Sequence, residues 1–548
     1  MTLKLHNTLT RNLDPFTPLT EGKVTLYTCG PTVYDYPHVG NWASFIYWDV
    51  LVRTLIASGY TVERVMNLTD VGHLVSDADE GEDKLEKGAR REGKTAWEVA
   101  EFYAEDFLAG MEKLGLLPPE HLVRATDFIT QQLDLIRILK EKGFTYQTHD
   151  GIYFNTSKFP SYADFARLDL AAQKAGARVE ANDEKRQPWD FALWKFTEPG
   201  ITRDMQWATP DDLLELPPKN QEYRVGSMGY EKGAGSDRAT KSDETSAALS
   251  APDGGSRGDR REAVSADCGG ESMTESEDSD NTVYGFPGWH LECSAMAMSI
   301  LGPTIDIHTG GIDHIPVHHT NEIAQSEAAS GAQFANYWLH NNHLKIDGGK
   351  ISKSLGNGYT LQNLEERGYS PLDLRMFILQ SQYTNEGNFT FDNLTAAQNR
   401  LVSWRSYAEL RHQIHDRLDG DEKKNDNTED YLSLQAASGA VREALQNNLN
   451  TPEALRIIDE AFAKLDNRSL SAIHRHGLVG FLETIDELLG LQLLDTTPDI
   501  DDAMKRLILQ RQRARESKDW TESDRLRDEI EKSGIKLRDA KNETIWSR

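Results

Sequence analysis

Two short segments of the chain carry side chains that could act on the phosphates of a nucleotide. The first contains His38, Gly40 and Asn41 and lies at a predicted turn between a strand and a helix. A small residue there lets a phosphate approach the backbone, and the first amides of the helix offer N–H groups to the anion. The imidazole and the amide side chain can donate as well. By itself, this short run also fits an ordinary structural turn.

The second segment is a loop with two lysines, Lys350 and Lys353, in the run KISKSLGN at 350–357. It follows Asp347-Gly-Gly and is rich in Gly and Ser, so it cannot be a core element. Cations in such a loop can close over a polyphosphate and stabilise the charge that migrates toward a leaving pyrophosphate. A solvated charged loop is the plainer interpretation. Together, the two segments favour adenylyl transfer from ATP more strongly than either does separately.

The elements that must position these residues form a strand–helix–strand unit. Residues 24–29 are β-branched and aromatic, residues 41–57 follow an apolar helical pattern, and a second apolar run covers 61–71. This order predicts a parallel sheet with a right-handed crossover. Ligands bind at the carboxyl ends of the strands in such sheets, so the chemistry is expected at the turn after the first strand.

The rest of the chain changes character twice. Helical patterns dominate from 94 to 143, and a short β-like stretch follows at 150–159. From about 211 to 282, Ser, Gly, Asp and Glu accumulate and large apolar residues are few, which predicts a disordered insert without a catalytic role. Cys268, inside the insert, is interpreted as an incidental thiol. After Ser370 the chain is predicted to be almost wholly helical, with strand-like sequence returning only near its end.

Composition limits the class of protein and its partners. The 548 residues include 60 Lys and Arg against 88 Asp and Glu, which gives a formal net charge of −28. Taken alone, this excess argues against nucleic-acid binding but leaves room for a local basic patch. It also suits a protein that works in high salt. Three cysteines cannot form a disulfide framework and no stretch is apolar enough to span a membrane, so we expect a cytoplasmic protein.

The two phosphate-site segments are similar to the two signatures of class I aminoacyl-tRNA synthetases, here HVGN at 38–41 and KISKS at 350–354. The chain resembles the cysteinyl-tRNA synthetase family most closely. The stretches that carry this resemblance follow the family's order: YTCGPTVYDYPHVGN, NLTDVGHL, DFALWK, PGWHLECSAM, DIHTGGIDHIPVHHTNEIAQSEA, WLHNNHLKIDGGKISKSLGN, SPLDLRMFIL and NNLNTPEAL. The resemblance covers nearly the whole chain apart from the insert.

The resemblance implies an α/β fold, with a Rossmann-like parallel-sheet catalytic domain that contains an inserted connective subdomain and is followed by an α-helical tRNA-binding region. The expected boundaries are 1–125 and 283–368 for the two halves of the catalytic domain, 126–205 for the connective subdomain, 211–282 for the acidic insert, 369–490 for a helical bundle and 491–548 for a small C-terminal helical segment on the anticodon side.

The resemblance also implies a zinc site, whose ligands match the family's at four positions: Cys29, Cys293, His318 and Glu322. Spacing alone leaves a buried cysteine or a capping histidine open at these positions. His318 is preferred over its neighbours His314 and His319 because it aligns with the first histidine of the family's HHxNE run. Zinc bonds a soft thiolate far better than a hydroxyl, whereas an apolar pocket separates such close analogues by only about 10–200-fold. The metal would therefore distinguish cysteine from serine.

Further roles carry over from the family's motifs. Thr69 and Trp289 are expected to line the cysteine pocket, and Asp313 to bind the ribose hydroxyls of ATP. The expected catalytic residues are His38, Asn41, Lys350 and Lys353. The expected ATP-binding residues are His38, Gly40, Asn41, Asp313 and Lys353.

The implied reaction has two steps. The carboxylate of L-cysteine attacks the α-phosphate of Mg²⁺-bound ATP, and the terminal ribose hydroxyl of tRNA(Cys) then takes the acyl group. We expect these three substrates, one Zn²⁺ per chain, Mg²⁺ with ATP and a monomeric protein. Two alternatives stay open: a related ligase that joins cysteine to an amino sugar, as in mycothiol-type chemistry, and an inactive tRNA-binding paralogue. The complete helical region after Ser370 favours tRNA, and the intact signatures argue against an inactive paralogue.

Overall fold

The computed structural model describes residues 2–72, 83–170, 184–198, 200–215, 282–351, 356–413, 428–466, 468–540 and 543–548. The chain divides into one unit made of residues 1–213 and 283–548 and a second unit made of residues 214–282. Almost all of the second unit lies outside the described residues, together with Cys268 and most of the predicted acidic insert. Lys353 of the lysine loop also lies outside them.

The centre of the first unit is a parallel sheet of five strands in the order β12–β11–β3–β4–β5. Its strands are β3 (Lys23–Thr28), β4 (Thr61–Leu68), β5 (His121–Arg124), β11 (Ile305–Gly311) and β12 (Ala335–Asn341). The strands β3 and β4 flank α1 (Val39–Ala57), so the predicted strand–helix–strand unit and the α/β fold are confirmed. The chain order reverses between β3 and β11, and ligands bind in the crevice at such a switch point.

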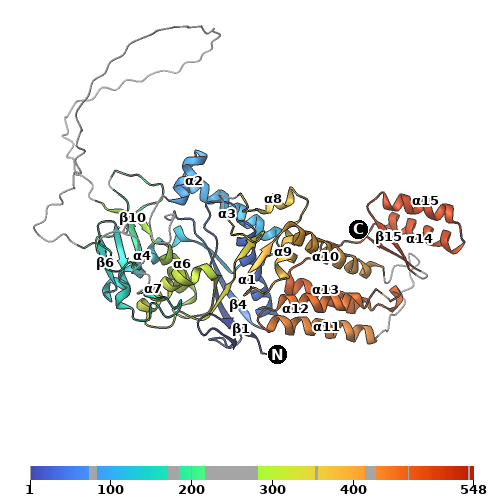
Figure 1. Ribbon diagram of the computed structural model, residues 1–548, viewed down its shortest axis with the longest axis horizontal. Helices are drawn as coiled ribbons and strands as arrows, with labels where there is room; N and C mark the ends of the chain where they lie inside the picture. The colour runs from blue at the N-terminus through green and yellow to red at the C-terminus, as the bar shows by residue number, and fades with distance from the viewer. Residues whose placement is uncertain are drawn as a thin grey trace, which may run out of the picture. The chain divides into compact units, whose positions relative to one another are not determined.

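Helix α1 begins at the HVGN segment and is buried on nearly all sides. Its tryptophans Trp42 and Trp48 are each 1% exposed, and Trp42 stacks on Phe107 of α3 (Ala96–Lys113) with 5.2 Å between ring centroids. The helix also packs against β4, α9 (Pro371–Leu379) and α13 (Arg475–Leu489), as Figure 1 shows. A helix that is apolar all round must be covered in this way. The core therefore fixes the position of His38 at the start of α1.

A second sheet, antiparallel, has the strand order β6–β7–β8–β10–β9. Its strands are β6 (Thr145–Thr148), β7 (Gly151–Phe154), β8 (Phe191–Phe196), β9 (Trp207–Ala208) and β10 (Tyr284–Pro287). The edge strand β9 pairs with its inner neighbour β10 although residues 209–283 separate them in sequence, so the chain leaves and rejoins the sheet at this edge. Three helices that pack on one another accompany it: α4 (Ile129–Glu141), α6 (Trp289–Leu301) and α7 (Thr320–Ser330).

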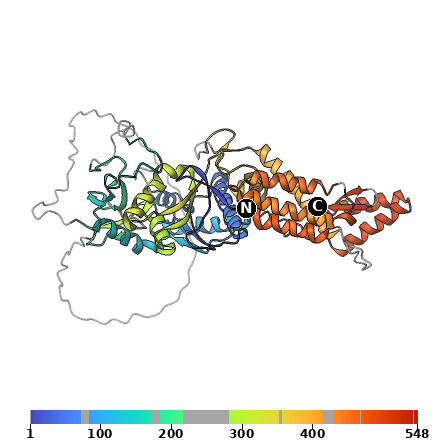
Figure 2. The same ribbon diagram turned by 90° about the horizontal axis from the view of Figure 1, so that it is seen from below.

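The chain after Ser370 is mainly helical, as predicted, and several of its helices lie side by side in Figures 1 and 2. Besides α9 and α13, its helices are α10 (Phe391–Glu409), α11 (Thr428–Gln446), α12 (Thr451–Ala463), α14 (Asp502–Glu516) and α15 (Trp520–Glu531). The strand-like sequence near the end forms a hairpin of β15 (Lys536–Ala540) and β16 (Glu543–Ser547). One short strand was not predicted: β14 (Gly387–Phe389) pairs with β13 (Leu344–Ile346), and three residues are too few to show an alternation of their own.

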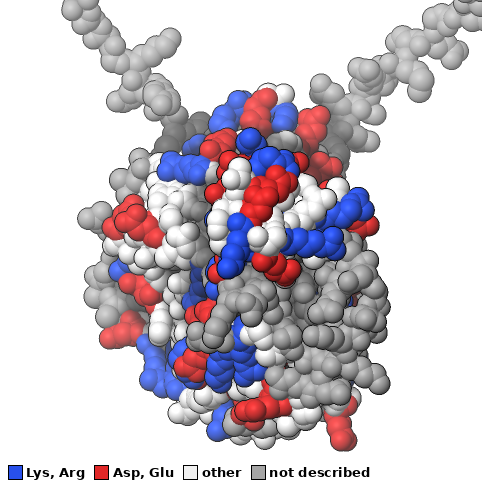
Figure 3. Space-filling model, turned by 90° about the vertical axis from the view of Figure 1, so that its right-hand side faces the viewer, with Lys and Arg blue, Asp and Glu red and all other residues white. Residues whose placement is uncertain are grey.

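Small elements complete the first unit: the hairpin of β1 (Lys4–Asn7) and β2 (Asn12–Pro15), and the helices α2 (Lys84–Glu92) and α8 (Leu361–Glu365). On the face shown in Figure 3, basic and acidic side chains are interspersed rather than separated into patches of one sign. Within the described residues, no helix combines the length and the apolar character that a bilayer crossing requires.

Candidate active site and metal centre

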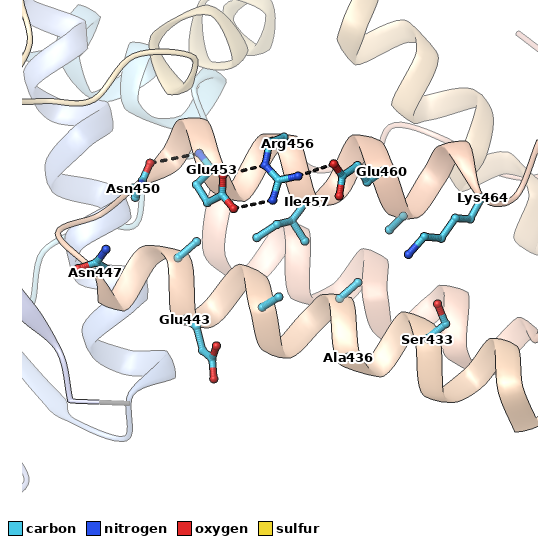
Figure 4. A pocket seen from close by; sticks show the side chains of 14 residues that line it. Ser433, Ala436, Glu443, Asn447, Asn450, Glu453, Arg456, Ile457, Glu460 and Lys464 are labelled. Atoms are coloured by element: carbon cyan, nitrogen blue, oxygen red, sulfur yellow. Dashed lines mark hydrogen bonds and ion pairs between the residues drawn. The ribbon is translucent and has the colours of Figure 1, made fainter.

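A cavity of about 710 Å³ opens at the carboxyl ends of β3 and β11, where the strand order reverses. Most of the predicted site residues line it: Cys29, His38, Gly40, Asn41, Thr69, Trp289, Cys293, Asp313, His318 and Lys350. A second hollow, of about 530 Å³, lies between α11 and α12, with alanines along its floor and Arg456 between Glu453 and Glu460 (Figure 4). It contains none of the predicted site residues, so we assign the chemistry to the cavity at the sheet.

His38 is the N-cap of α1, and its own hydrogen bonds determine which ring nitrogen faces a ligand. Its Nδ1 accepts from the backbone N–H groups of Gly40 at 3.1 Å and Asn41 at 3.2 Å, while Asn41 Oδ1 accepts from the His38 N–H at 3.1 Å. Because Nδ1 is an acceptor, the proton of the neutral ring lies on Nε2. Likewise, Asn41 is left with Nδ2 as a donor. Both side chains can therefore donate toward an anion at the start of α1.

The lysine loop meets the same end of α1. A side chain on Gly40 would place its Cβ 2.7 Å from Ile351 Cδ1 and 3.0 Å from the His38 ring, so glycine is required at this close approach. Val39 N–H also donates to Tyr359 O at 2.8 Å, which holds the far side of the loop against α1. Lys350 lines the cavity. The two segments that the sequence analysis paired are therefore neighbours in space.

The four predicted zinc ligands also converge. One ligand atom from each of Cys29, Cys293, His318 and Glu322 can be chosen so that all four lie within 4.8 Å of one another. Cys29 follows β3, Cys293 lies in α6, and His318 precedes α7, which contains Glu322 one helical turn later. His318 Nε2 lies 2.9 Å from Glu322 Oε1. Two thiols, an imidazole and a carboxylate fit the tetrahedral N/S/O coordination that zinc prefers.

A second set of four side chains shares two of these residues. Cys29 and Glu322 are also grouped with His308 and His319, again within 4.8 Å. His308 Nε2 lies 2.8 Å from Glu322 Oε2, and His319 Nε2 lies 3.4 Å from Cys29 Sγ. The geometry thus brings both His318 and the neighbour that we set aside, His319, close to the same thiol and carboxylate.

Burial and neighbouring charges perturb the protonation of this cluster. The hydrogen bond from Cys29 lowers the pKa of Cys293 to about 7, against the opposing effect of burial. Burial disfavours the charged form of His318, but Glu322 and Cys293 outweigh it and raise the pKa of His318 to about 10. Burial raises the pKa of Glu322, but His308 and His318 hold it below its ordinary value. His318 and Glu322 are therefore paired as imidazolium and carboxylate near neutral pH, and the thiol of Cys293 ionises more readily than that of an ordinary cysteine.

Two histidines next to this cluster were not among the predicted site residues. His308 lies on β11 and His340 on β12. The distance from His340 Nε2 to His319 Nδ1 is 2.7 Å. The other ring nitrogen of His340 lies 2.7 Å from Thr8 Oγ1. Both histidines occur in stretches that carry the family resemblance, but no spacing rule connects residues on two separate strands.

The remaining predicted residues lie around the same cavity. The ring of Trp289 is 4.5 Å from that of His318, centroid to centroid, so this side chain covers the imidazole. Asp313 turns back over Gly311, where an added Cβ would lie 2.3 Å from Asp313 Oδ1. Thr69 follows β4 and is 2% exposed.

Known proteins of one family are similar to this chain over nearly its whole length. A family model described as the tRNA synthetases class I (C) catalytic domain matches residues 15–212 and 272–399, and one described as the cysteinyl-tRNA ligase anticodon binding domain matches residues 497–546. Cysteine–tRNA ligase 1 of Burkholderia lata is 37% identical over 545 residues, covering 98% of this chain and 95% of the relative. The cysteine–tRNA ligase of Treponema denticola is 33% identical over 578 residues and covers 100% of both chains.

Among solved structures, Mycobacterium tuberculosis methionyl-tRNA synthetase in complex with methionyl-adenylate matches with a TM-score of 0.53. The match covers 86% of this chain and 93% of the other at 13% identity, so it shows a shared fold alone.

Proposed function

Because the chain belongs to the cysteine–tRNA ligase family, we propose that its cavity at the sheet activates L-cysteine with ATP and passes the cysteinyl group to tRNA(Cys). The observation that carries the proposal is that one cavity is lined both by the start of α1 and by the thiols of Cys29 and Cys293. The nucleotide and the amino acid would thus meet at the switch point of the sheet. No side chain has to act as a nucleophile, so the residues bind, orient and stabilise charge.

On the nucleotide side, His38 Nε2–H and Asn41 Nδ2–H would donate to phosphate oxygens above the N-terminus of α1. Gly40 lets the anion come close to the helix amides, whose N–H groups and dipole favour negative charge. Lys350, and Lys353 outside the described residues, would stabilise the charge that moves to pyrophosphate, and Mg²⁺ would enter with ATP. Asp313 would accept the ribose hydroxyls.

On the amino-acid side, Cys29, Cys293, His318 and Glu322 would hold one Zn²⁺. That ion would supply a soft acceptor for the substrate thiolate, which a serine hydroxyl cannot match. We choose His318 rather than His319 because His318, Cys293 and Trp289 line the cavity, whereas His308 and His319 do not. Trp289 and Thr69 would form the walls around the bound cysteine.

The C-terminal residues would bind the tRNA. The anticodon-binding family model covers 497–546, inside the predicted 491–548 segment, and the helices between 369 and 490 would contact the tRNA stem. We keep the predicted domain boundaries, a monomeric state and a cytoplasmic location as parts of this proposal. The amino-sugar ligase is not favoured, because it lacks the long tRNA-reading region that this chain has.

The proposal is tested by ATP–pyrophosphate exchange with each candidate amino acid, followed by aminoacylation of purified tRNA(Cys). We expect exchange with L-cysteine, strong discrimination against L-serine, and transfer to tRNA(Cys). Exchange that prefers another amino acid, or acyl transfer to an amino sugar in place of tRNA, would contradict it.

A further inference from the structure

A chain of hydrogen bonds reaches the wall of the cavity from a buried carboxylate that no role above uses. Gly30 N–H donates to Asn67 Oδ1 at 2.8 Å, and Asn67 Nδ2 donates to Thr69 Oγ1 at 2.9 Å. Thr69 Oγ1 in turn donates to Glu292 Oε2 at 3.1 Å. Glu292 is 0% exposed, and both Asn67 and Thr69 line the cavity. The chain thus connects the turn after β3 with helix α6.

The direction of every bond in this chain follows from its first member. A backbone N–H can only donate, so the atom of Asn67 that faces Gly30 must be the carbonyl oxygen. The amide nitrogen of Asn67 must then face Thr69 and donate to it. The hydroxyl proton of Thr69 points to the Glu292 carboxylate, which accepts it. A hydroxyl has one proton and two lone pairs, so Thr69 Oγ1 keeps only an acceptor for a ligand.

The surrounding backbone holds the main chain of Thr69 in place, and the bonds to Asn67 and Glu292 orient its hydroxyl. Thr69 N–H donates to Pro31 O at 3.0 Å, and Thr69 O accepts from Val33 N–H at 3.1 Å. Gly30 approaches β4 so closely that an added Cβ would lie 1.7 Å from Asn67 O. Thr69 therefore cannot turn to offer its proton to the cavity without breaking the bond to Glu292.

We propose that Glu292 is a positioning residue for amino-acid recognition, which makes Thr69 Oγ1 an acceptor for the α-ammonium group of the substrate. This inference rests on the proposed function. The cysteine thiol is taken by the Cys29 and Cys293 side of the cavity, and its carboxylate must face the nucleotide. The ammonium group is the substrate's remaining charged group and its strongest donor. An oxygen that can only accept attracts this group and repels a carboxylate, so it orients the substrate end to end.

Comparing the affinities of three thiol ligands distinguishes the ammonium contact from the contacts of the thiol and the carboxylate. The ligands are L-cysteine, cysteamine, which lacks the carboxylate, and 3-mercaptopropionate, which lacks the ammonium. Their affinities for the zinc-loaded full chain are measured by calorimetry, and the KM and kcat for cysteine by ATP–pyrophosphate exchange. Thr69→Val should weaken cysteine and cysteamine roughly 10–100-fold, as expected for a hydrogen bond to a charged group. It should leave 3-mercaptopropionate within about twofold, because that ligand makes no such bond.

Glu292→Gln tests the positioning role. The glutamine can still accept the hydroxyl proton but can also present its amide, so the direction of the Thr69 bond is no longer enforced. We expect cysteine and cysteamine to weaken about 2–10-fold, in KM more than in kcat, with unchanged zinc content and unchanged 3-mercaptopropionate affinity. Thr69→Ser keeps the hydroxyl and should restore most of the affinity that Thr69→Val loses.

Asp190→Asn is the matched control. Asp190 is a buried carboxylate that accepts from Thr156 N–H at 2.9 Å and from the Thr156 hydroxyl, yet neither residue lines the cavity. Its substitution should leave the selectivity among the three ligands unchanged.

Equal weakening of all three ligands by Thr69→Val would overturn the ammonium assignment. Loss of zinc from Glu292→Gln, or an unchanged cysteine affinity in that variant, would overturn the positioning role. If the unmodified protein catalysed no exchange with cysteine, the proposed function would fail instead, while calorimetry with the three ligands would still decide the inference.

Discussion

Replacing Arg375 by methionine should destabilise the junction between the parallel-sheet domain and the C-terminal helices. Arg375 lies on α9 and is 0% exposed. Its guanidinium pairs with Asp49 of α1, and it donates to Leu489 O at the end of α13 at 2.6 Å and to Leu114 O after α3 at 3.0 Å. One side chain thus reaches the ends of two neighbouring helices and the buried carboxylate of a third.

The magnitude follows from what the substitution leaves behind. Methionine keeps much of the apolar stem but removes every donor, so three main-chain carbonyls, those of Leu489, Leu114 and Gly115, and one carboxylate lose a partner. Removing one member of a buried ion pair costs about 3–5 kcal/mol. Asp49 retains Arg53, at 2.7 Å, and the Leu117 N–H, also at 2.7 Å. Because Asp49 keeps these partners, we expect the free energy of unfolding to fall by about 3 kcal/mol, the lower end of that range.

Urea unfolding measures the decrease in the free energy of unfolding. Hydrogen exchange of the backbone amides in α1 and α13 shows where in the chain the decrease occurs. Arg375→Lys keeps the charge but not the fork of donors. Its stability should therefore fall between that of the unmodified protein and that of Arg375→Met. Arg456→Met is the matched control, since Arg456 is also an arginine paired with carboxylates, those of Glu453 and Glu460, but on an exposed helix face (Figure 4). An exposed pair contributes little, so this control should hardly change the urea midpoint. If Arg375→Met behaved like Arg456→Met, the junction would not depend on the buried pair.

Four further predictions concern the site, the insert and the C-terminal segment. Cys293→Ser should greatly weaken zinc binding and cysteine activation together; full zinc in that variant, by metal analysis, would contradict the ligand assignment. Lys353→Ala should slow adenylate formation by orders of magnitude with little change in cysteine binding, because the ammonium acts on charge that develops in the transition state. A normal rate in pre-steady-state kinetics would rule this out. Replacing residues 226–280 by a short Gly/Ser linker should leave zinc content and cysteine activation within a few-fold of normal, and a collapse of activation would place the insert in the site. The hydrogen bond from Arg511 lowers the pKa of Asp539 from 3.8 to about 2, so its stabilising contribution is complete above pH 4 and is lost toward pH 2. Asp539→Asn should therefore lower the stability of the C-terminal segment at pH 7 but not at pH 2, as thermal unfolding followed at both pH values would show.

The local features of the site could be predicted from the residues of each segment. The apolar pattern of α1, the β-branched run before Cys29 and the turn residues between them depend on neighbours in the chain, so they predict the strand–helix–strand unit and the location of His38 at its turn. The pair of nucleotide signatures and the four proposed zinc ligands could be predicted because a family resemblance relates distant segments that spacing does not.

The distant side chains that lie around those residues became apparent from the folded arrangement of the chain. His308 contacts Glu322 from β11, His340 contacts His319 from β12, and the contact between Thr69 and Glu292 joins residues far apart in the chain. The pairing of β9 with β10 across the insert is of the same kind. Such contacts arise from sheet order and helix packing, which no single segment encodes. Periodicity reports which face of an element is buried, but not which other element covers it.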